Sequence, residues 1–199
     1  MARKSTEERR KEITEGLLEA MAEHGYAGAS IKRIAARAGL TPGLIHYHFD
    51  TKQAILLALL KRLFVPQIQV LRSLADEANS AEQALESVLE ALLSTGDSAD
   101  PKAVAAWVTI GTEAIREPEI NEAFSQALLE IEALFESIVD RGVDSGEFDA
   151  GELSNRACAA ALLAVVEGYF TVAATCREAI PQGTAVQAAL RMAKGLLQR

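Results

Sequence analysis

Apolar residues recur at helical spacing along most of this chain, and no run alternates in the way that strands require. The first such stretch is opened by a capping box at residues 5–8 and ended by Gly25. Its apolar positions are Ile13, Leu17, Leu18 and Met21. The pattern predicts a helix with one buried face between these two signals.

Two short helices are predicted next. Ser30 can cap the first, and Gly39 follows it. The apolar positions of this helix are Ile31, Ile34, Ala35 and Ala38. Thr41 can cap the second, with Pro42 at its first position, where a missing N–H is not needed. Its apolar positions are Leu44, Ile45 and Phe49.

The remaining elements are also predicted to be helices. Asp50 and Gln53 form a possible capping box for a fourth helix. Its apolar positions are Ile55, Leu56, Leu59, Leu60 and Leu63. Further helices are predicted at about 81–95, 102–117, 119–142, 154–176 and 184–198, with breaks at 96–101, 118, 142–151 and 181–183. The predicted fold class is therefore all-α, with about nine helices.

Composition and charge refine this picture. Hydrophobic residues make up 49% of the 199 residues, so the chain can build a core and we expect a folded protein. The net charge of -8 argues against general affinity for nucleic acid. The charge is uneven, however: residues 1–62 hold 11 Lys and Arg against 7 Asp and Glu, whereas residues 63–199 hold 9 against 21. A small basic unit, which attracts phosphate, precedes an acidic body.

The sequence predicts a cytoplasmic protein that does not enter a membrane. Residues 1–19 are charged throughout, unlike a secretory signal. The longest run of low charge, residues 157–176, contains Glu167, which is costly in lipid, so we expect a buried helix there. Cys158 and Cys176 would lie roughly 27 Å apart on that helix, too far for a disulfide.

Two short helices joined by a tight turn, after a longer helix, predict a helix-turn-helix, whose second helix meets base edges in DNA. Pro42 and Gly43 add little bulk at the start of that helix, where free N–H groups favour anions. Lys32, Arg33 and Lys52 lie in the first turns of their helices. The helix dipole disfavours a cation there by about a few tenths of a kcal/mol, and a bound phosphate would reverse the sign.

The run His46, Tyr47 and His48 permits three interpretations. These side chains cannot all be buried, because Ile45 and Phe49 occupy the inner face. Donors aimed at a DNA backbone and groove are favoured over ordinary surface or packing positions. A metal site is disfavoured, because positions i and i+2 of a helix point about 200° apart and no third ligand is near. A catalytic site lacks a nucleophile with an orienting acid.

The segment ASIKRIAARAGLTPGLIHYHFDTKQAIL resembles the DNA-binding segment of the TetR family of regulators, over about residues 8–62. The matching features are the Ile-x-x-Ile-Ala helix, the Ala-Gly-Leu turn, the His-Phe pair and the Lys after Asp50. The run Gly-Leu-Ile-His-Tyr-His-Phe is most similar to the branch of choline-responsive, BetI-type repressors. The family's usual Tyr two residues before His48 is His46 here.

The resemblance implies an all-helical homodimer with an N-terminal three-helix DNA-binding domain and a C-terminal helical domain for ligand binding and dimerisation. The implied boundaries are 1–50, a linking helix at 51–75, and 76–199. Groove contacts implied by the resemblance are Thr41, Pro42, Gly43 and His46, and phosphate contacts are Ser30, Arg33, Tyr47, His48 and Lys52. Arg3, Lys4, Arg9 and Arg10 form either a DNA-contacting arm or a solvated basic tail.

The last two predicted helices of the acidic body indicate a dimer interface. The helix at 154–176 is apolar almost all round, and the last helix has an apolar stripe. The predicted interface residues are Leu162, Val166, Val186, Leu190, Ala193 and Leu197. Together the two helices suggest a four-helix bundle formed with a second copy, as in the family. The alternative is an ordinary monomer core.

A ligand pocket is a second hypothesis for the body, against the simpler interpretation of core packing. Its candidate residues are Trp107, Gly111, Glu113, Phe135, Glu167 and Tyr169. The sequence thus predicts a ligand-responsive regulator, most simply a repressor, that binds double-stranded DNA as a homodimer and responds to a small-molecule effector of unknown identity. No cofactor or metal is expected. The alternatives are an activator or a regulator without an effector, and, from another class, a helical enzyme or metal-binding protein.

Overall fold

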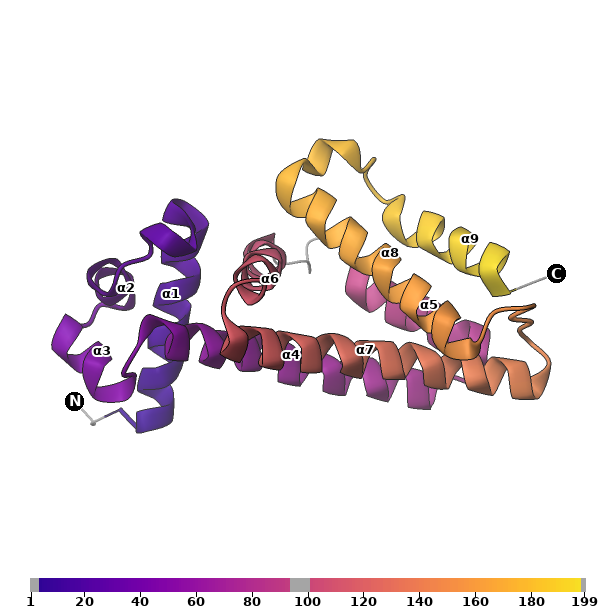
Figure 1. The fold of residues 1–199 in the computed structure, drawn as a ribbon, viewed down its shortest axis with the longest axis horizontal. Helices are drawn as coiled ribbons and strands as arrows, with labels where there is room; N and C mark the ends of the chain where they lie inside the picture. The colour runs from indigo at the N-terminus through magenta and orange to yellow at the C-terminus, as the bar shows by residue number, and fades with distance from the viewer. Residues whose placement is uncertain (1–3, 94–100, 198–199) are drawn as a thin grey trace. The chain divides into compact units, whose positions relative to one another are not determined.

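The computed structural model describes residues 4–93 and 101–197, and in this part of the chain every regular element is a helix (Figure 1). The elements are α1 (Thr6–Gly28), α2 (Ile31–Ala38), α3 (Pro42–His48), α4 (Lys52–Glu77), α5 (Ala81–Leu93), α6 (Pro101–Ala114), α7 (Pro118–Ser145), α8 (Asn155–Thr175), the 3-10 turn η1 (Arg177–Ala179) and α9 (Ala185–Leu197). The all-α prediction is confirmed. The predicted break at 96–101 falls largely on residues outside the described part, and Arg3 also lies outside it.

Residue contacts divide the chain into two compact units. The first comprises residues 1–64 and 101–124, and the second comprises residues 65–100 and 125–199. Helices α4 and α7 each begin in the first unit and end in the second. The boundaries expected at residues 50 and 75 separate a DNA-binding part, a linking helix and an effector-binding part, which is a different criterion from contact density. They remain a prediction.

The first unit is built on α1, which packs against α2, α3 and α6. Ile13 and Leu17 are completely buried in this core. Gly16 allows α1 and α2 to approach closely, because a Cβ at that position would lie 2.7 Å from the Ile34 carbonyl oxygen. Helix α6 adds Trp107, whose ring lies 4.7 Å from that of Phe124 between centroids. This packing fixes the scaffold on which the two short helices rest.

Local capping signals explain most helix starts in this unit. Ser5 and Glu8 form the expected capping box, and the Thr41 hydroxyl accepts from the Leu44 N–H at 3.3 Å. The capping box expected from Asp50 and Gln53 is wrong. Thr51 caps α4 instead, accepting from the Ala54 N–H at 3.0 Å, and the Gln53 amide donates to the Glu117 carboxylate.

The expected end of α1 at Gly25 is also corrected. Gly25 has φ of +66°, outside the helical region, yet one further turn continues to Gly28. The chain therefore kinks at Gly25 rather than stopping, and this turn places Tyr26 back in the core, where only 9% of its surface is exposed.

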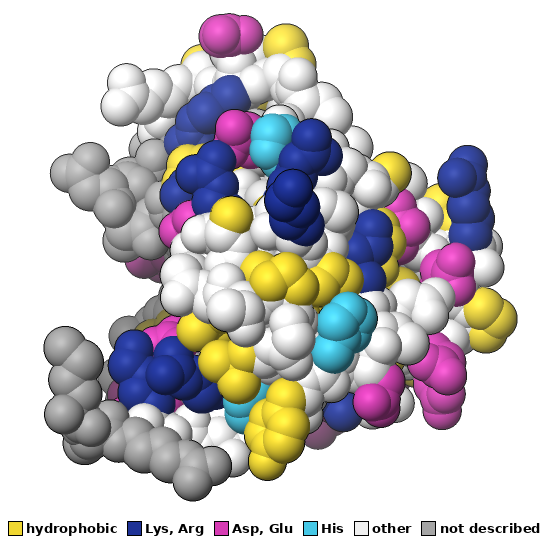
Figure 2. Space-filling model, turned by 90° about the vertical axis from the view of Figure 1, so that its left-hand side faces the viewer, with side chains coloured by type: hydrophobic (Ala, Val, Ile, Leu, Met, Phe, Trp, Pro, Cys, Tyr) yellow, Lys and Arg dark blue, Asp and Glu magenta, His cyan; other side chains and the backbone are white. Residues whose placement is uncertain are grey.

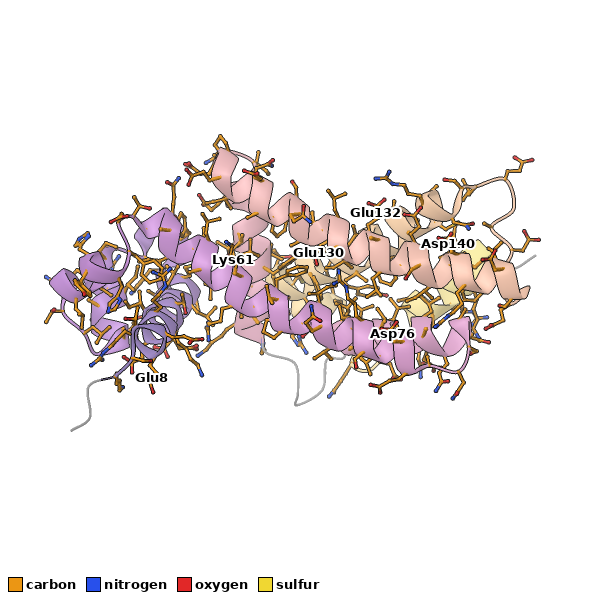
Figure 3. All side chains as sticks on the ribbon, turned by 90° about the horizontal axis from the view of Figure 1, so that it is seen from below. Glu8, Lys61, Asp76, Glu130, Glu132 and Asp140 are labelled. Carbon is orange, nitrogen blue, oxygen red and sulfur yellow. The ribbon has the colours of Figure 1, made fainter. Side chains whose placement is uncertain are left out.

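In the second unit α5, α8 and α9 pack together. Polar contacts along α7 tie that helix to its neighbours: Glu130 pairs with Arg72 at 3.0 Å, and Glu132 pairs with Arg156 at 2.9 Å (Figure 3). The Arg141 guanidinium donates to the carbonyl oxygens of Ala75 and Ser80, at 3.0 and 3.2 Å. The turn between α4 and α5 is thereby held against α7.

The face of α8 that was predicted for dimerisation is occupied inside the chain. Leu162, Val166, Ala193 and Leu197 are at most 2% exposed, because α8 and α9 pack on each other and on α5. Val186 and Leu190 are partly exposed. The exposed side of α8 carries Arg156, Val172 and several small uncharged residues, among them Ala157, Ala160, Ala164, Gly168, Thr171 and Thr175. Alanine occurs on both the buried and the exposed sides of α8, so the sequence alone does not indicate which side faces the core.

Helices α4 and α8 are long and apolar enough to span a membrane by length and composition. Two such helices are only weak evidence for membrane spans, because core helices of soluble proteins meet the same criterion.

Candidate DNA-binding site

Helix α3 presents polar groups outward from a buried anchor. Ile45 is completely buried and Phe49, just after the helix, is 4% exposed. In contrast, His46 is exposed, and Tyr47 exposes 77% of its surface. His48 is half-buried, with its ring edge-on to that of Tyr47 at 5.1 Å. The expected outward projection of this run is confirmed.

The start of α3 is open as well. Thr41, Pro42 and Gly43 are exposed, and a Cβ added at Gly43 would meet nothing within 4 Å. Thr41 uses its hydroxyl as the cap, which leaves the first N–H groups of α3 directed outward. An extended ligand can therefore approach the backbone of α3 closely at this end.

Cations flank α3 on the neighbouring helices. Lys32 and Arg33 are exposed in the first turn of α2, which contains no acidic residue. Within the described residues, neither of them pairs with a carboxylate: Arg33 donates to the Gly28 carbonyl oxygen at 2.6 Å. Ser30 uses its hydroxyl to accept from the Arg33 N–H. Figure 2 shows Lys, Arg and His side chains on this side of the molecule.

Two other basic side chains of the first unit are neutralised by carboxylate partners. Arg37 pairs with Glu23, and Arg62 pairs with Glu15 at 2.7 Å. Lys32, Arg33 and Lys52 make no such pair with a described residue, and they lie at the starts of α2 and α4, where the helix dipoles favour an anion.

Lys52 is held in place at the start of α4. Its ammonium donates to the Tyr26 carbonyl oxygen at 2.8 Å and lies 4.0 Å from the centre of the Tyr26 ring. An ammonium has three donors, so this arrangement leaves hydrogen-bonding capacity for a further acceptor. Burial lowers the pKa of Lys52, and the nearby Glu113 carboxylate opposes that shift.

Tyr26 is a residue that sequence reasoning missed. Burial raises its pKa to about 12, with smaller contributions from the negative charges of Glu113 and Glu117. Its hydroxyl is buried and has no hydrogen-bond partner among the described residues. No local motif indicated the Tyr26–Lys52 contact, because it joins residues that are 26 positions apart.

The contact that Arg10 makes was also missed by sequence reasoning. Arg10 was expected in a basic arm or tail, but its guanidinium donates to the His48 carbonyl oxygen at 2.7 Å. Lys4 and Arg9 are likewise not free, since both pair with Glu12. The available signal was periodicity: Arg10, although exposed, precedes the buried Ile13 and Leu17 by one and two helical turns.

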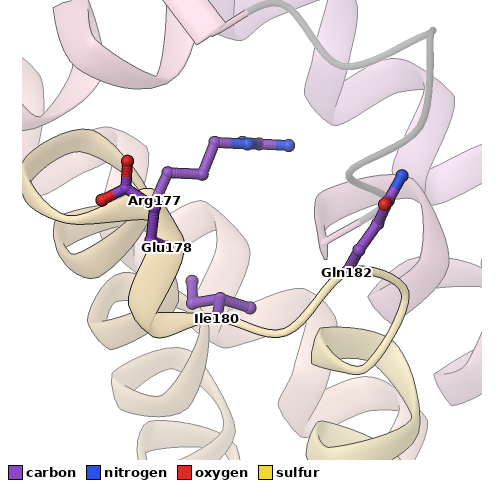
Figure 4. A pocket seen from close by; sticks show the side chains of 4 residues that line it. All are labelled: Arg177, Glu178, Ile180 and Gln182. Atoms are coloured by element: carbon purple, nitrogen blue, oxygen red, sulfur yellow. The ribbon is translucent and has the colours of Figure 1, made fainter.

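The six residues proposed for a ligand pocket fall into both compact units. Trp107, Gly111 and Glu113 lie in the first, where Gly111 faces the Phe124 ring. Phe135, which is completely buried, Glu167 and Tyr169 lie in the second. None of the six lines the depression formed by Arg177, Glu178, Ile180 and Gln182, into which Arg177 extends (Figure 4). Their role in ligand binding remains a prediction.

Within the described ranges, no group of three His, Cys, Asp or Glu side chains is arranged to hold a metal ion. Cys158 is buried and Cys176 is exposed, and both are free thiols.

The chain is similar to known transcriptional regulators in sequence and in fold. The profile described as "Bacterial regulatory proteins, tetR family" matches residues 13–59. The profile "BetI-type transcriptional repressor, C-terminal" matches residues 81–198, more than half of the chain. The transcriptional regulator BetI of Rhizobium meliloti is 31% identical over 119 residues, which cover 57% of this chain and 55% of that protein. This match thus spans little more than half of the relative.

Two further similarities extend over more of the chain. The repressor AcnR of Corynebacterium glutamicum is 25% identical over 142 residues, covering 69% of this chain and 68% of that protein. The structure of a putative transcriptional regulator from Saccharomonospora viridis, in complex with choline, matches with a TM-score of 0.81 at 22% identity. It covers 97% of this chain and all of that one, and at this identity the likeness concerns the fold alone.

Proposed function

The chain belongs to the TetR family of bacterial transcriptional regulators, and on that basis we propose that it represses transcription as a homodimer bound to a palindromic operator and released by a small-molecule effector. The observation that supports DNA binding best is the exposed start of α3, flanked by Lys32, Arg33 and Lys52 without carboxylate pairs. Bacterial operator DNA lies in the cytoplasm, so we expect the protein to act there.

The individual contacts follow the groove geometry of helix-turn-helix proteins. We assign base contacts to Thr41, Pro42, Gly43 and His46, because these positions are exposed at the start and outer face of α3. Phosphate contacts are assigned to the flanking residues Ser30, Lys32, Arg33, Tyr47, His48 and Lys52. Ser30 and Thr41 act chiefly through their helix ends, since their hydroxyls already cap α2 and α3.

The homodimer is supported by the exposed side of α8. Small side chains at Ala160, Ala164 and Gly168 allow a second helix to approach closely, and the one charged side chain on this stripe, Arg156, is paired with Glu132. Val186 and Leu190, which are partly exposed on α9, can contribute to the same interface. A two-fold dimer places two α3 helices on successive major-groove faces, about 34 Å apart.

The effector is proposed by class only. The Saccharomonospora viridis protein is described in complex with choline, and a quaternary ammonium is recognised by aromatic faces. In this chain the Trp107 ring stacks with that of Phe64 at a centroid distance of 6.1 Å and is tilted against that of Phe124 at 4.7 Å. Trp107 is the sole tryptophan, so its fluorescence reports directly on a ligand that separates these rings.

The alternative functions are a DNA-binding regulator of a different kind and a metal-binding protein. An activator, or a regulator without an effector, would keep the same DNA contacts, and transcription assays with candidate effectors distinguish these cases. The metal-binding alternative requires stoichiometric zinc bound through His46 and His48. Direct measurement of zinc uptake by calorimetry distinguishes this case from DNA binding.

The deciding experiment is a genomic selection. The purified chain, unfolded and refolded to remove bound small molecules, is incubated with fragmented DNA of its source organism at moderate salt. We expect one or a few inverted repeats to be enriched, and a folded Lys32→Glu, Arg33→Glu double variant to lose that enrichment. Absence of enrichment by the folded wild-type chain would contradict the proposed function.

A further inference from the structure

Arg10 connects the first helix to the far end of the recognition helix. Its Nη1 donates to the His48 carbonyl oxygen at 2.7 Å, and its guanidinium lies 3.9 Å from the centre of the Phe49 ring. The side chain therefore makes a hydrogen bond and a cation–π contact at once. Both contacts lie where α3 ends, although Arg10 itself is exposed.

Helix α3 depends on such contacts because it is short. It has seven residues, far fewer than an isolated helix needs to be stable in water. Ile45 is the only residue of α3 that is buried, so one side chain and the following Phe49 anchor it to the core. Both anchors lie in the middle of α3 or after its end, so the orientation of this short helix also depends on restraints at its two ends.

The two ends of α3 are restrained differently. At the start, the Thr41 hydroxyl accepts from the Leu44 N–H, a contact made within the helix itself. At the end, the final carbonyl oxygens lack helical partners and carry the negative end of the dipole. Arg10 supplies both a donor and a positive charge to this end, and it does so from a different helix.

We infer that Arg10 is a positioning residue for base recognition: it sets the orientation of α3, and it does not bind a DNA phosphate itself. This inference rests on the proposed function for its DNA readouts. Tilting α3 moves His46 and Gly43 relative to the base edges, whereas phosphate contacts from α2 and α4 are unchanged. Loss of Arg10 should therefore reduce discrimination between DNA sequences more than it reduces non-specific affinity.

Arg9 provides a matched control. It is adjacent in sequence, carries the same charge and pairs with Glu12 at 2.8 Å on α1. Arg9→Ala thus removes one positive charge from the same region and leaves the end of α3 intact. Arg10→Lys keeps the charge and a donor but loses the planar guanidinium that stacks on Phe49.

The first test needs no DNA. Amide hydrogen exchange across residues 44–49 should accelerate in Arg10→Ala, return partly toward wild type in Arg10→Lys, and stay unchanged in Arg9→Ala. Exchange in α4 serves as the internal reference for overall stability. Unchanged exchange of α3 in a folded Arg10→Ala variant would overturn the inference, whatever the protein binds.

The second test uses the operator recovered by genomic selection and a version with one base pair substituted in each half-site. We expect Arg10→Ala to lower the preference between them by about tenfold, the loss that one hydrogen bond to a charged group brings. The salt dependence of binding should keep its wild-type slope. A slope reduced by about one, with the preference retained, would instead make Arg10 a phosphate contact. If the wild-type chain selects no DNA, the proposed function fails and the exchange experiment alone decides the role of Arg10.

Discussion

At the scale of single residues, the candidate DNA-binding site combines side chains that project into solvent with one that a hydrogen bond holds in place. His46 and Tyr47 project into solvent, whereas Lys52 is fixed on the Tyr26 carbonyl oxygen. A held donor loses less conformational entropy when it binds a phosphate than a mobile one does. The Tyr26–Lys52 contact therefore prepares a cation for binding, and it explains why an aromatic residue lies buried beside the start of α4.

Lys52→Ala should weaken binding to all DNA sequences alike and lower the slope of log affinity against log salt by about one, because one phosphate contact is lost. Filter binding or fluorescence anisotropy at several salt concentrations measures this. Lys61→Ala is the control: Lys61 is exposed further along α4 and labelled in Figure 3. A slope equal to that of wild type in Lys52→Ala would remove Lys52 from the phosphate contacts.

In the second unit, the position of Gly142 in α7 is filled by one neighbouring side chain. A Cβ at this position would overlap the ring of Phe148, which packs directly on the α7 backbone. We expect Gly142→Ala to lower the free energy of unfolding by about 1–2 kcal/mol, because overpacking outweighs the gain in helix propensity. Urea unfolding measures the change.

The double variant Gly142→Ala, Phe148→Leu identifies the cause. If the ring is responsible, the two changes are coupled, and the double variant is more stable than the sum of the single effects predicts. Additive effects would show that Phe148 is not what the glycine accommodates.

At the scale of elements, sequence reasoning succeeded where the signal is local. Ser5, Ser30 and Thr41 cap their helices as expected, because a cap involves atoms three residues apart. It failed at α4, where Thr51 and Asp50 are adjacent cap candidates and Gln53 turns to Glu117, 64 positions away. The contacts of Arg10 and Tyr26 were missed for the same reason: their partners are 38 and 26 positions distant.

Helix α5 begins against a carboxylate from a distant part of the chain, and this gives a pH dependence. Glu147 accepts from the Glu82 N–H at 3.1 Å and from the Ser145 hydroxyl at 2.9 Å. The hydrogen bond from Glu82 is the main reason why the pKa of Glu147 lies below its ordinary value of 4.5. A lowered pKa in the folded state stabilises the fold above pH 4.5, and this stabilisation is lost as the pH falls through the folded value.

Glu147→Gln should therefore lower the free energy of unfolding at pH 7, and its difference from wild type should shrink below pH 4.5. Urea unfolding between pH 3 and pH 7 measures both values. Glu122→Gln, an exposed change in α7, controls for the loss of one negative charge. A difference from wild type that stays constant with pH would show that the α5 contact does not depend on ionisation.

At the scale of the whole molecule, assembly determines whether two recognition helices can act together. The sequence indicated that α8 and α9 dimerise, but the named residues lie mostly on the inner side. Apolar periodicity alone does not tell a helix face buried in its own chain from one buried in a partner. The exposed small residues of α8 now define the proposed interface.

Ala164→Glu places a charge in the middle of that exposed side and should yield monomers of about 21.3 kDa by sedimentation equilibrium. Burying an unpaired carboxylate is costly, so the dimer should dissociate while the helical content is retained. Gln67→Glu adds the same charge on an exposed position of α4 and should leave the dimer intact. A stable dimer in Ala164→Glu would exclude this side of α8 from the interface.

The division of α3 into buried and exposed positions has a consequence for engineering. Folding depends on Ile45 and Phe49, whereas His46 and Tyr47 contribute little to the core. Surface substitutions of this kind change stability by about half a kcal/mol or less. The outer positions of α3 therefore form a set that can be randomised to redirect the protein to new operators, while the scaffold and its response to the effector are inherited unchanged.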